Sequence, residues 1–207
     1  MAAVRERGKK DATYFLGGVG CFGAKRPGGG WREAEPSIDR VTDIEKMSFE
    51  DALMKWGIDK EQASIIDPVV ITGPQRKSID SDHFYAVVTP NAKAIGVTVP
   101  GGIQILRGRD GKYRGFYGAT YILGFTEEQI LLYEKEWNVY DLSITISTHE
   151  LFYKDVTSIT TEESEYGNAV LLRAGGTDFR SGYIHSGSLS NDQIQGIKNL
   201  VREKKAQ

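Results

Sequence analysis

The chain reads Tyr117-Gly-Ala-Thr-Tyr-Ile-Leu123, then Gln129-Ile-Leu-Leu-Tyr133, then Ser143-Ile-Thr-Ile-Ser147. Each run is short, rich in β-branched and aromatic residues, and separated from the next by polar or turn-forming residues, which is typical of β-strands. Similar runs occur on both sides, from residue 84 to residue 184. The pattern predicts consecutive antiparallel strands that form a small curled sheet.

Turn-forming residues support this interpretation. Asp110-Gly111 lies between two strand-like runs and is the strongest hairpin signal in the chain. Pro90-Asn91 and Gly175-Gly176 mark two further turns. After the last strand, Ser190 and Gln193 have the spacing of a capping box, which predicts the start of a C-terminal helix. Its apolar stripe would pack on the sheet and consists of Ile194, Ile197, Leu200 and Val201.

The first part of the chain has a different pattern. Residues 1–37 combine basic residues with clustered glycines and show no apolar period, which predicts a flexible arm. Residues 38–68 predict a short helical hairpin, followed by the β domain over residues 69–207. In that hairpin, Ser48 and Asp51 would cap the first helix.

The ends of both helices in the hairpin are also marked in the sequence. Gly57 would end the first helix. A second helix is expected from Asp59 to Ile66, because Asp67-Pro68 disfavours helical backbone. Val69-Val-Ile-Thr72 is then the candidate first strand of the β domain.

Composition limits the classes of function. The chain has 207 residues and a formal net charge of -2, with 26% charged residues, so no global field attracts nucleic acid. Cys21 is the only cysteine, which excludes an internal disulfide framework and favours a reducing, cytoplasmic location. No stretch approaches the about 20 apolar residues that span a bilayer, so we expect no transmembrane segment.

No group of residues predicts an enzyme. Gly18-Val-Gly20-Cys-Phe-Gly23 has the letters of a dinucleotide fingerprint, but more glycines follow where the helix would have to begin. A flexible arm is the preferred interpretation, with phosphate binding as the weaker alternative. His83, His149 and His185 are too far apart to predict a metal site. We therefore expect no catalytic residue, cofactor or metal.

A basic hairpin is the most suggestive local feature. Arg107, Arg109, Lys112 and Arg114 place four cations within eight residues around the predicted Asp110-Gly111 turn. They could bind phosphate groups of a lipid headgroup or of a phosphorylated partner. Charged hairpin tips also keep strand edges soluble, so this second interpretation stays open.

Two strings resemble bacterial pleckstrin-homology-like domains. The first runs from Asp110-Gly-Lys-Tyr-Arg through Tyr121-Ile-Leu-Gly-Phe-Thr126 to Tyr133, and the second is Phe152-Tyr-Lys-Asp155-Val-Thr-Ser-Ile159. The resemblance covers about residues 100–205. It implies a seven-stranded, strongly bent antiparallel barrel, plugged at one end by the C-terminal helix.

The sequence is also similar to uncharacterised bacterial cytoplasmic proteins with a short helical hairpin before such a domain. Gly115, Gly118 and Gly124 depart from ordinary barrel strands and predict bulges or tight bends. The expected fold class is therefore α+β, mainly β.

The resemblance implies a non-enzymatic protein-interaction or assembly module that binds another protein or forms a homo-oligomer. The alternative function is peripheral membrane binding, in which the basic hairpin contacts phosphoinositide headgroups. A third hypothesis, a hydrolytic pocket in the barrel, has no specific residues in its support.

Overall fold

The computed structural model describes residues 31–59, 66–76, 105–108, 110–139, 142–164, 167–180, 183–184 and 191–206. The chain forms two compact units. The first comprises Met1–Glu45, Pro74–Gly118 and Trp137–Ile144. The second comprises Lys46–Gly73, Ala119–Glu136 and Thr145–Gln207.

Eight of the described strands belong to one sheet. They are β1 (Ile66–Arg76), β4 (Tyr117–Phe125), β5 (Gln129–Asn138), β6 (Ile144–Phe152), β7 (Val156–Ser164), β8 (Gly167–Ala174), β9 (Thr177–Arg180) and β10 (Tyr183–Ile184). Their order is β6-β5-β4-β1-β10-β8-β7, with β9 also paired to β8. The pairings of β8 with β7, β9 and β10 are antiparallel, as the turn signals predict.

β9 and β10 act as one interrupted strand. Both pair with β8, and β9 places Arg180 opposite Leu171 whereas β10 places Ile184 opposite Asn168, so the registers differ by one residue. If β9 and β10 count as one strand, the sheet has seven strands. Strands of this sheet that are consecutive in the chain pair with each other except at β6 and β7, and the first strand, β1, pairs with the last, β10. Among the described strands, β6 and β7 end the path and do not pair with each other.

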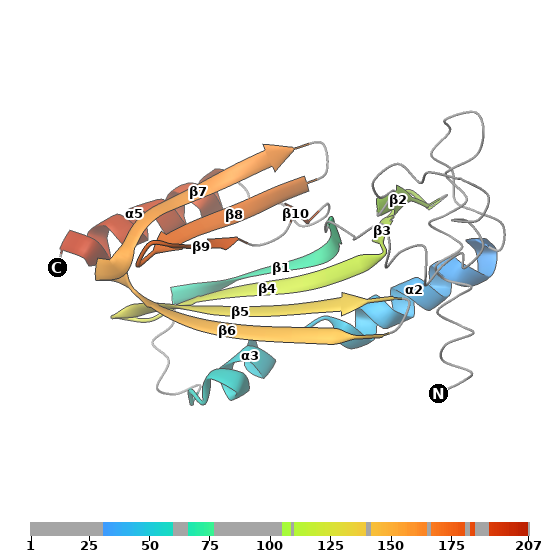
Figure 1. Cartoon of the computed structure of the whole chain (residues 1–207), viewed down its shortest axis with the longest axis horizontal. Coiled ribbons are helices and arrows are strands. Elements are labelled where there is room, and N and C mark those ends of the chain that lie inside the picture. The colour runs from blue at the N-terminus through green and yellow to red at the C-terminus, as the bar shows by residue number, and fades with distance from the viewer. Residues whose placement is uncertain are drawn as a thin grey trace. The chain divides into compact units, whose positions relative to one another are not determined.

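The sheet bends sharply between its two ends. Figure 1 shows β6 turning into β7, which places β7, β8 and β9 in a second layer that faces β1, β4 and β5. The bend occurs at a short 3₁₀ turn, η2 (Tyr153–Asp155). The α+β, mainly β fold expected from the sequence is confirmed, as a strongly bent sheet that remains open between β6 and β7.

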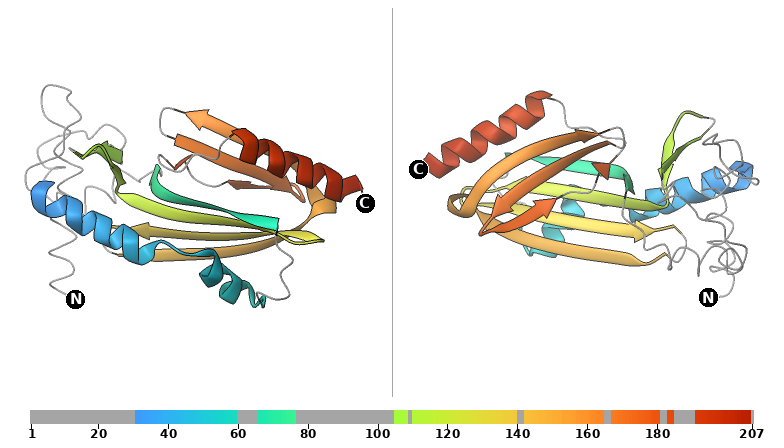
Figure 2. Two further views of the ribbon diagram at one scale, coloured as in Figure 1. Left: turned by 180° about the vertical axis from the view of Figure 1, so that it is seen from behind. Right: turned by 45° about the horizontal axis from the view of Figure 1, so that its top comes forward.

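The main core of the second unit lies between these layers. Strands contribute buried residues such as Ile71, Leu123 and Leu172, and α5 (Asn191–Ala206) adds Ile197 and Val201. The view from behind shows α5 lying along the β7–β8 layer (Figure 2). The amphipathic C-terminal helix predicted from the sequence is therefore confirmed, and its apolar stripe completes the core.

Helix α3 (Phe49–Trp56) covers the opposite face of the sheet. Its Ala52 packs with Ile122 and Tyr133, which point away from the main core because strand residues alternate between faces. The predicted capping box is present: the Ser48 side chain accepts from Asp51 N at 3.2 Å, and Asp51 accepts from Ser48 N at 3.0 Å. Gly57 ends the helix with a left-handed φ of 69°, as expected.

The first unit contains α2 (Trp31–Glu45) and a hairpin of β2 (Ile105–Arg107) and β3 (Tyr113–Gly115). The hairpin is antiparallel, with Leu106 opposite Arg114. It confirms the turn predicted at Asp110-Gly111.

Two predictions for the first part of the chain are wrong. The prediction of a flexible arm over residues 1–37 is wrong from Trp31 onward, because α2 begins there. Ala34, Ile38 and Val41 are buried at helical spacing, a signal that was hidden by Pro36 within the helix and by the preceding glycines.

The second helix was expected to extend to Ile66, but β1 begins at that residue. β1 contains the predicted strand Val69-Val-Ile-Thr72 and is longer than expected. The remainder of that helix beyond Asp59 and the strands predicted on either side of Pro90-Asn91 lie outside the described residues.

Candidate functional site

The basic hairpin has a tightly bonded turn. Gly108 N donates to Lys112 O at 2.8 Å, and Gly111 N donates to Gly108 O at 3.1 Å. Asp110 Oδ1 accepts from Lys112 N at 3.1 Å, while Gly111 has a φ of 82°, which suits glycine. The turn therefore follows from the Asp-Gly pair at its tip.

Arg114 is buried, unlike the other described cations of the hairpin. Its Nε and Nη2 each donate to Asp39 at 2.7 Å, and its Nη1 and Nη2 donate to Asp110 at 2.9 and 2.7 Å. Glu35 Oε1 lies 3.8 Å from Nη1. The hydrogen bond from Arg114 holds the pKa of Asp110 well below its usual range. These bonds tie β3 to α2 within the first unit.

The structure therefore corrects the predicted anion site. Arg114 does not belong to it, because carboxylates of the same unit already occupy its donors. Arg107 is exposed, with Nε bonded to Gly111 O at 3.3 Å and its guanidinium 5.8 Å from the Tyr113 ring centroid. Lys112 is exposed, and Arg109 lies outside the described residues.

A second candidate surface is the free edge of β6. β6 ends the sheet path of the described strands. Ile144, Ile146 and Phe152 lie at alternate positions, and each side chain is nearly half exposed, at 45% to 46%. The strand contains no lysine, arginine or proline, the residues that usually protect an edge from pairing.

The other end of the sheet path is covered. α5 lies along β7, and Lys205 Nζ donates to Val156 O at 2.6 Å. Between the two elements is a groove of about 310 Å³. Of the two strands that end the sheet path, β7 is therefore covered by α5, whereas the edge of β6 lacks such a cover among the described residues.

A cavity of about 320 Å³ opens between the two layers of the second unit. Its walls are largely apolar and include Tyr121, Leu132 and Phe179, and the His149 ring meets Phe179 edge-on at 4.9 Å. Asp178 at its rim is held by Arg173 through bonds of 2.5 and 2.9 Å. The cavity thus combines apolar walls with a few titratable side chains, namely Glu134, His149 and Asp178.

The described residues provide neither a three-residue metal site nor a membrane-spanning helix. Within the described part of the chain, no cluster of three His, Cys, Asp or Glu side chains is placed to hold a metal ion. No described helix has the length and apolar character needed to cross a bilayer.

The sequence reading missed the β6 edge and the cations that face the groove. The alternation of Ile144 and Ile146 was visible, but nothing local indicates that β6 ends the sheet. On α5, Lys198, Arg202 and Lys205 line the groove, and their spacing of four and three residues is the signal that places them on one face of the helix.

Neither a family model nor a curated protein sequence matches the chain. Among solved structures, it is similar to the crystal structure of a DUF1696 family protein with a pleckstrin-homology domain from Shewanella loihica PV-4. The two are 14% identical, and the match covers 64% of this chain and 99% of the other, with a TM-score of 0.29.

Proposed function

We propose that the chain is a non-enzymatic interaction module that self-associates through the edge of β6. The observation that carries the proposal is the exposed, uncharged and proline-free stretch around Ile146 at the end of the sheet. An edge of this kind is a template for pairing with another strand. Its occupant is a second copy of the same strand.

The sequence of β6 suits antiparallel pairing with itself. A two-fold axis at Thr148 makes Thr148 face its own copy and puts Ile144 opposite Phe152 of the other chain. Apolar residues opposite aromatic residues, and threonine opposite threonine, are favourable cross-strand pairs. The register places no pair of like charges face to face, since Glu150 lies opposite Ile146.

The first experiment measures the molar mass in solution by size-exclusion chromatography with light scattering. The wild-type chain is expected to form an oligomer that the Ile146→Lys variant does not form, because a charge blocks the edge. Met54→Lys is the matched control, since Met54 is 72% exposed but lies on α3. A wild type that stays monomeric at about 500 μM, well above a Kd of about 10 μM, would disprove self-association.

A cross-linking experiment tests the register. In a Cys21→Ser background, Thr148→Cys should form a symmetric disulfide, because facing Cα atoms of antiparallel strands lie about 4.5–5.5 Å apart. Glu150→Cys is the control, since the two copies of residue 150 are offset along the strands in this register. Efficient cross-linking of Glu150→Cys but not of Thr148→Cys would contradict the register.

Binding of anionic lipid headgroups is the second candidate function. It is supported by exposed Arg107 and Lys112 beside Tyr113, since cations next to an aromatic ring suit a membrane interface. Flotation with anionic vesicles at low salt tests it, using Arg107→Glu/Lys112→Glu as the variant and neutral vesicles as the control. Flotation that the variant retains would exclude the hairpin as the binding site.

A further inference from the structure

The groove between β7 and α5 in the second unit has an unusual charge distribution. Its lining residues are Val156, Thr157, Ser158 and Ile159 of β7, with Lys198, Val201, Arg202 and Lys205 of α5. Val156 and Val201 are buried and form its floor, while Arg202 and Lys205 are exposed at its rim. None of these described lining residues is acidic, although the chain as a whole has a net charge of -2.

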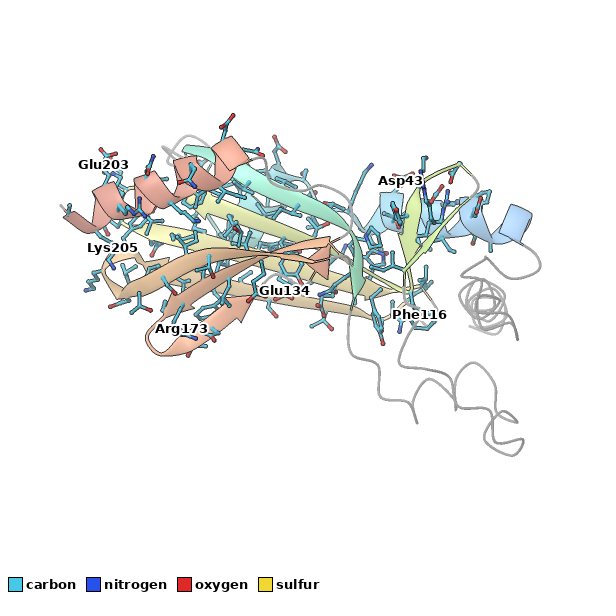
Figure 3. The ribbon with its side chains drawn as sticks, turned by 90° about the horizontal axis from the view of Figure 1, so that it is seen from above. Asp43, Phe116, Glu134, Arg173, Glu203 and Lys205 are labelled. Carbon is cyan, nitrogen blue, oxygen red and sulfur yellow. The ribbon has the colours of Figure 1, made fainter. Side chains whose placement is uncertain are left out.

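The three cations of the groove, Lys198, Arg202 and Lys205, lower the stability of the helix by repelling one another. Lys198 and Arg202 are four residues apart and Lys205 follows three residues later, and like charges at such spacings repel each other. Lys198 and Arg202 make no ion pair within the described part of the chain. Figure 3 shows Glu203 projecting from the side of α5 opposite Lys205, so it does not offset the charge of the groove.

The strand side of the groove offers a backbone acceptor. β7 pairs with β8 along one edge, with Thr160 opposite Leu171, and α5 lies along the other. The 2.6 Å bond from Lys205 Nζ to Val156 O shows that a carbonyl of this edge faces the groove and accepts a donor there. A carbonyl oxygen has two lone pairs, so Val156 O can accept one further donor from a bound segment.

We propose that this groove binds an extended acidic segment of another protein. The segment lies in the groove between β7 and α5, and its carboxylates contact Lys198 and Arg202 in charge-assisted hydrogen bonds. The concave shape favours a chain over a flat bilayer, whose headgroups cannot follow the groove to its floor. The site uses β7 and α5, whereas the proposed self-association uses β6, so the two proposals stand independently.

The test measures fluorescence anisotropy with a labelled eight-residue peptide of alternating glutamate and threonine. The protein carries Ile146→Lys, so that the β6 edge is blocked in every sample. We expect saturable binding at about 50 mM salt that weakens by about 500 mM, because screening shortens the range of the charges. The same peptide with glutamine in place of glutamate should bind at least about tenfold more weakly.

Matched variants locate the site. Lys198→Glu/Arg202→Glu should weaken binding of the glutamate peptide at least about tenfold, whereas Lys204→Glu, which lies off the groove on the same helix, should not. Amide shifts on peptide addition should centre on residues 156–159. Equal binding by the double variant, or no binding by the parent protein, overturns the proposal. So does binding only to phosphatidylserine vesicles and not to the peptide.

Discussion

Buried polar residues anchor both units through a few specific bonds. Tyr153 is 3% exposed, and its hydroxyl donates to Thr126 O at 2.9 Å, while its backbone N donates to Glu128 O at 3.3 Å. These bonds fix the turn between β4 and β5 against the bend between β6 and β7. Ionisation of this phenol would remove the hydrogen bond that it donates to Thr126 O.

Tyr153 predicts an alkaline limit to the stability of the second unit. Burial raises the pKa of Tyr153 to about 12, above the unfolded value of about 10. The neutral phenol therefore stabilises the folded state, and this contribution is fully present below the unfolded pKa. It is lost as pH rises from about 10 to about 12, by up to about 3 kcal/mol. Tyr153→Phe should lose about 1 kcal/mol at neutral pH but lack this pH dependence.

Urea unfolding followed by circular dichroism at about pH 8 and about pH 11 measures both proteins. Other tyrosines ionise in both, so the difference between the two proteins isolates Tyr153. Parallel losses of stability in wild type and variant would show that its ionisation is not coupled to folding.

Arg114 should be essential to the first unit although it contributes nothing to an anion site. Arg114→Met leaves Asp39 and Asp110 facing each other without their cation, and we expect a loss of about 2–3 kcal/mol. Lys112→Met in the same hairpin should change stability little, because Lys112 is exposed. Unfolding of the two variants, monitored by amide exchange of β3, makes the comparison. Similar protection in both would argue against a stabilising role for Arg114.

At the scale of single elements, Gly196 and Gly118 have opposite effects on the stability of the elements that contain them. Gly196 lies within α5 with open space where a Cβ would be, so it only weakens the helix. Gly118 in β4 lies directly against the Trp137 indole, and a Cβ there would clash with the ring. The sequence predicts a bulge or tight bend at Gly118, and the structure shows the close approach of an aromatic ring at this position.

Alanine substitution should separate these roles. Gly196→Ala is expected to stabilise the second unit by about 0.5–1 kcal/mol, because alanine restricts the unfolded chain and favours the helix. Gly118→Ala should destabilise the first unit by about 1–3 kcal/mol through the clash. Urea midpoints measure both changes. A lower midpoint for Gly196→Ala would indicate that α5 carries a contact at this position.

At the scale of the whole molecule, self-association should make stability depend on protein concentration. If pairing along β6 occurs only between folded chains, mass action raises the apparent Tm as the protein is concentrated from about 5 to about 500 μM. The Ile146→Lys variant should show a Tm that does not depend on concentration. Calorimetry at several concentrations measures this, and the same concentration dependence in both proteins would rule out the β6 edge as its origin.

Local sequence patterns determined most elements of this chain. The capping box of Ser48 and Asp51, the Asp110-Gly111 hairpin, the alternating strands and the stripe of α5 each depend on neighbouring residues, so the sequence alone predicts them. The helix from Trp31 was not predicted, because Pro36 and nearby glycines weaken the helical pattern of its apolar residues.

Only the tertiary structure decided which residues are available for function. Arg114 and Arg107 are similar in sequence context, but carboxylates distant along the chain bury one and leave the other exposed. β6 and β7 are similar strands, yet strand order and α5 cover one edge and expose the other. Contacts between segments that are distant in the chain decide which side chains and strand edges are exposed. Such contacts produce no periodic pattern in the sequence, so local patterns cannot predict them.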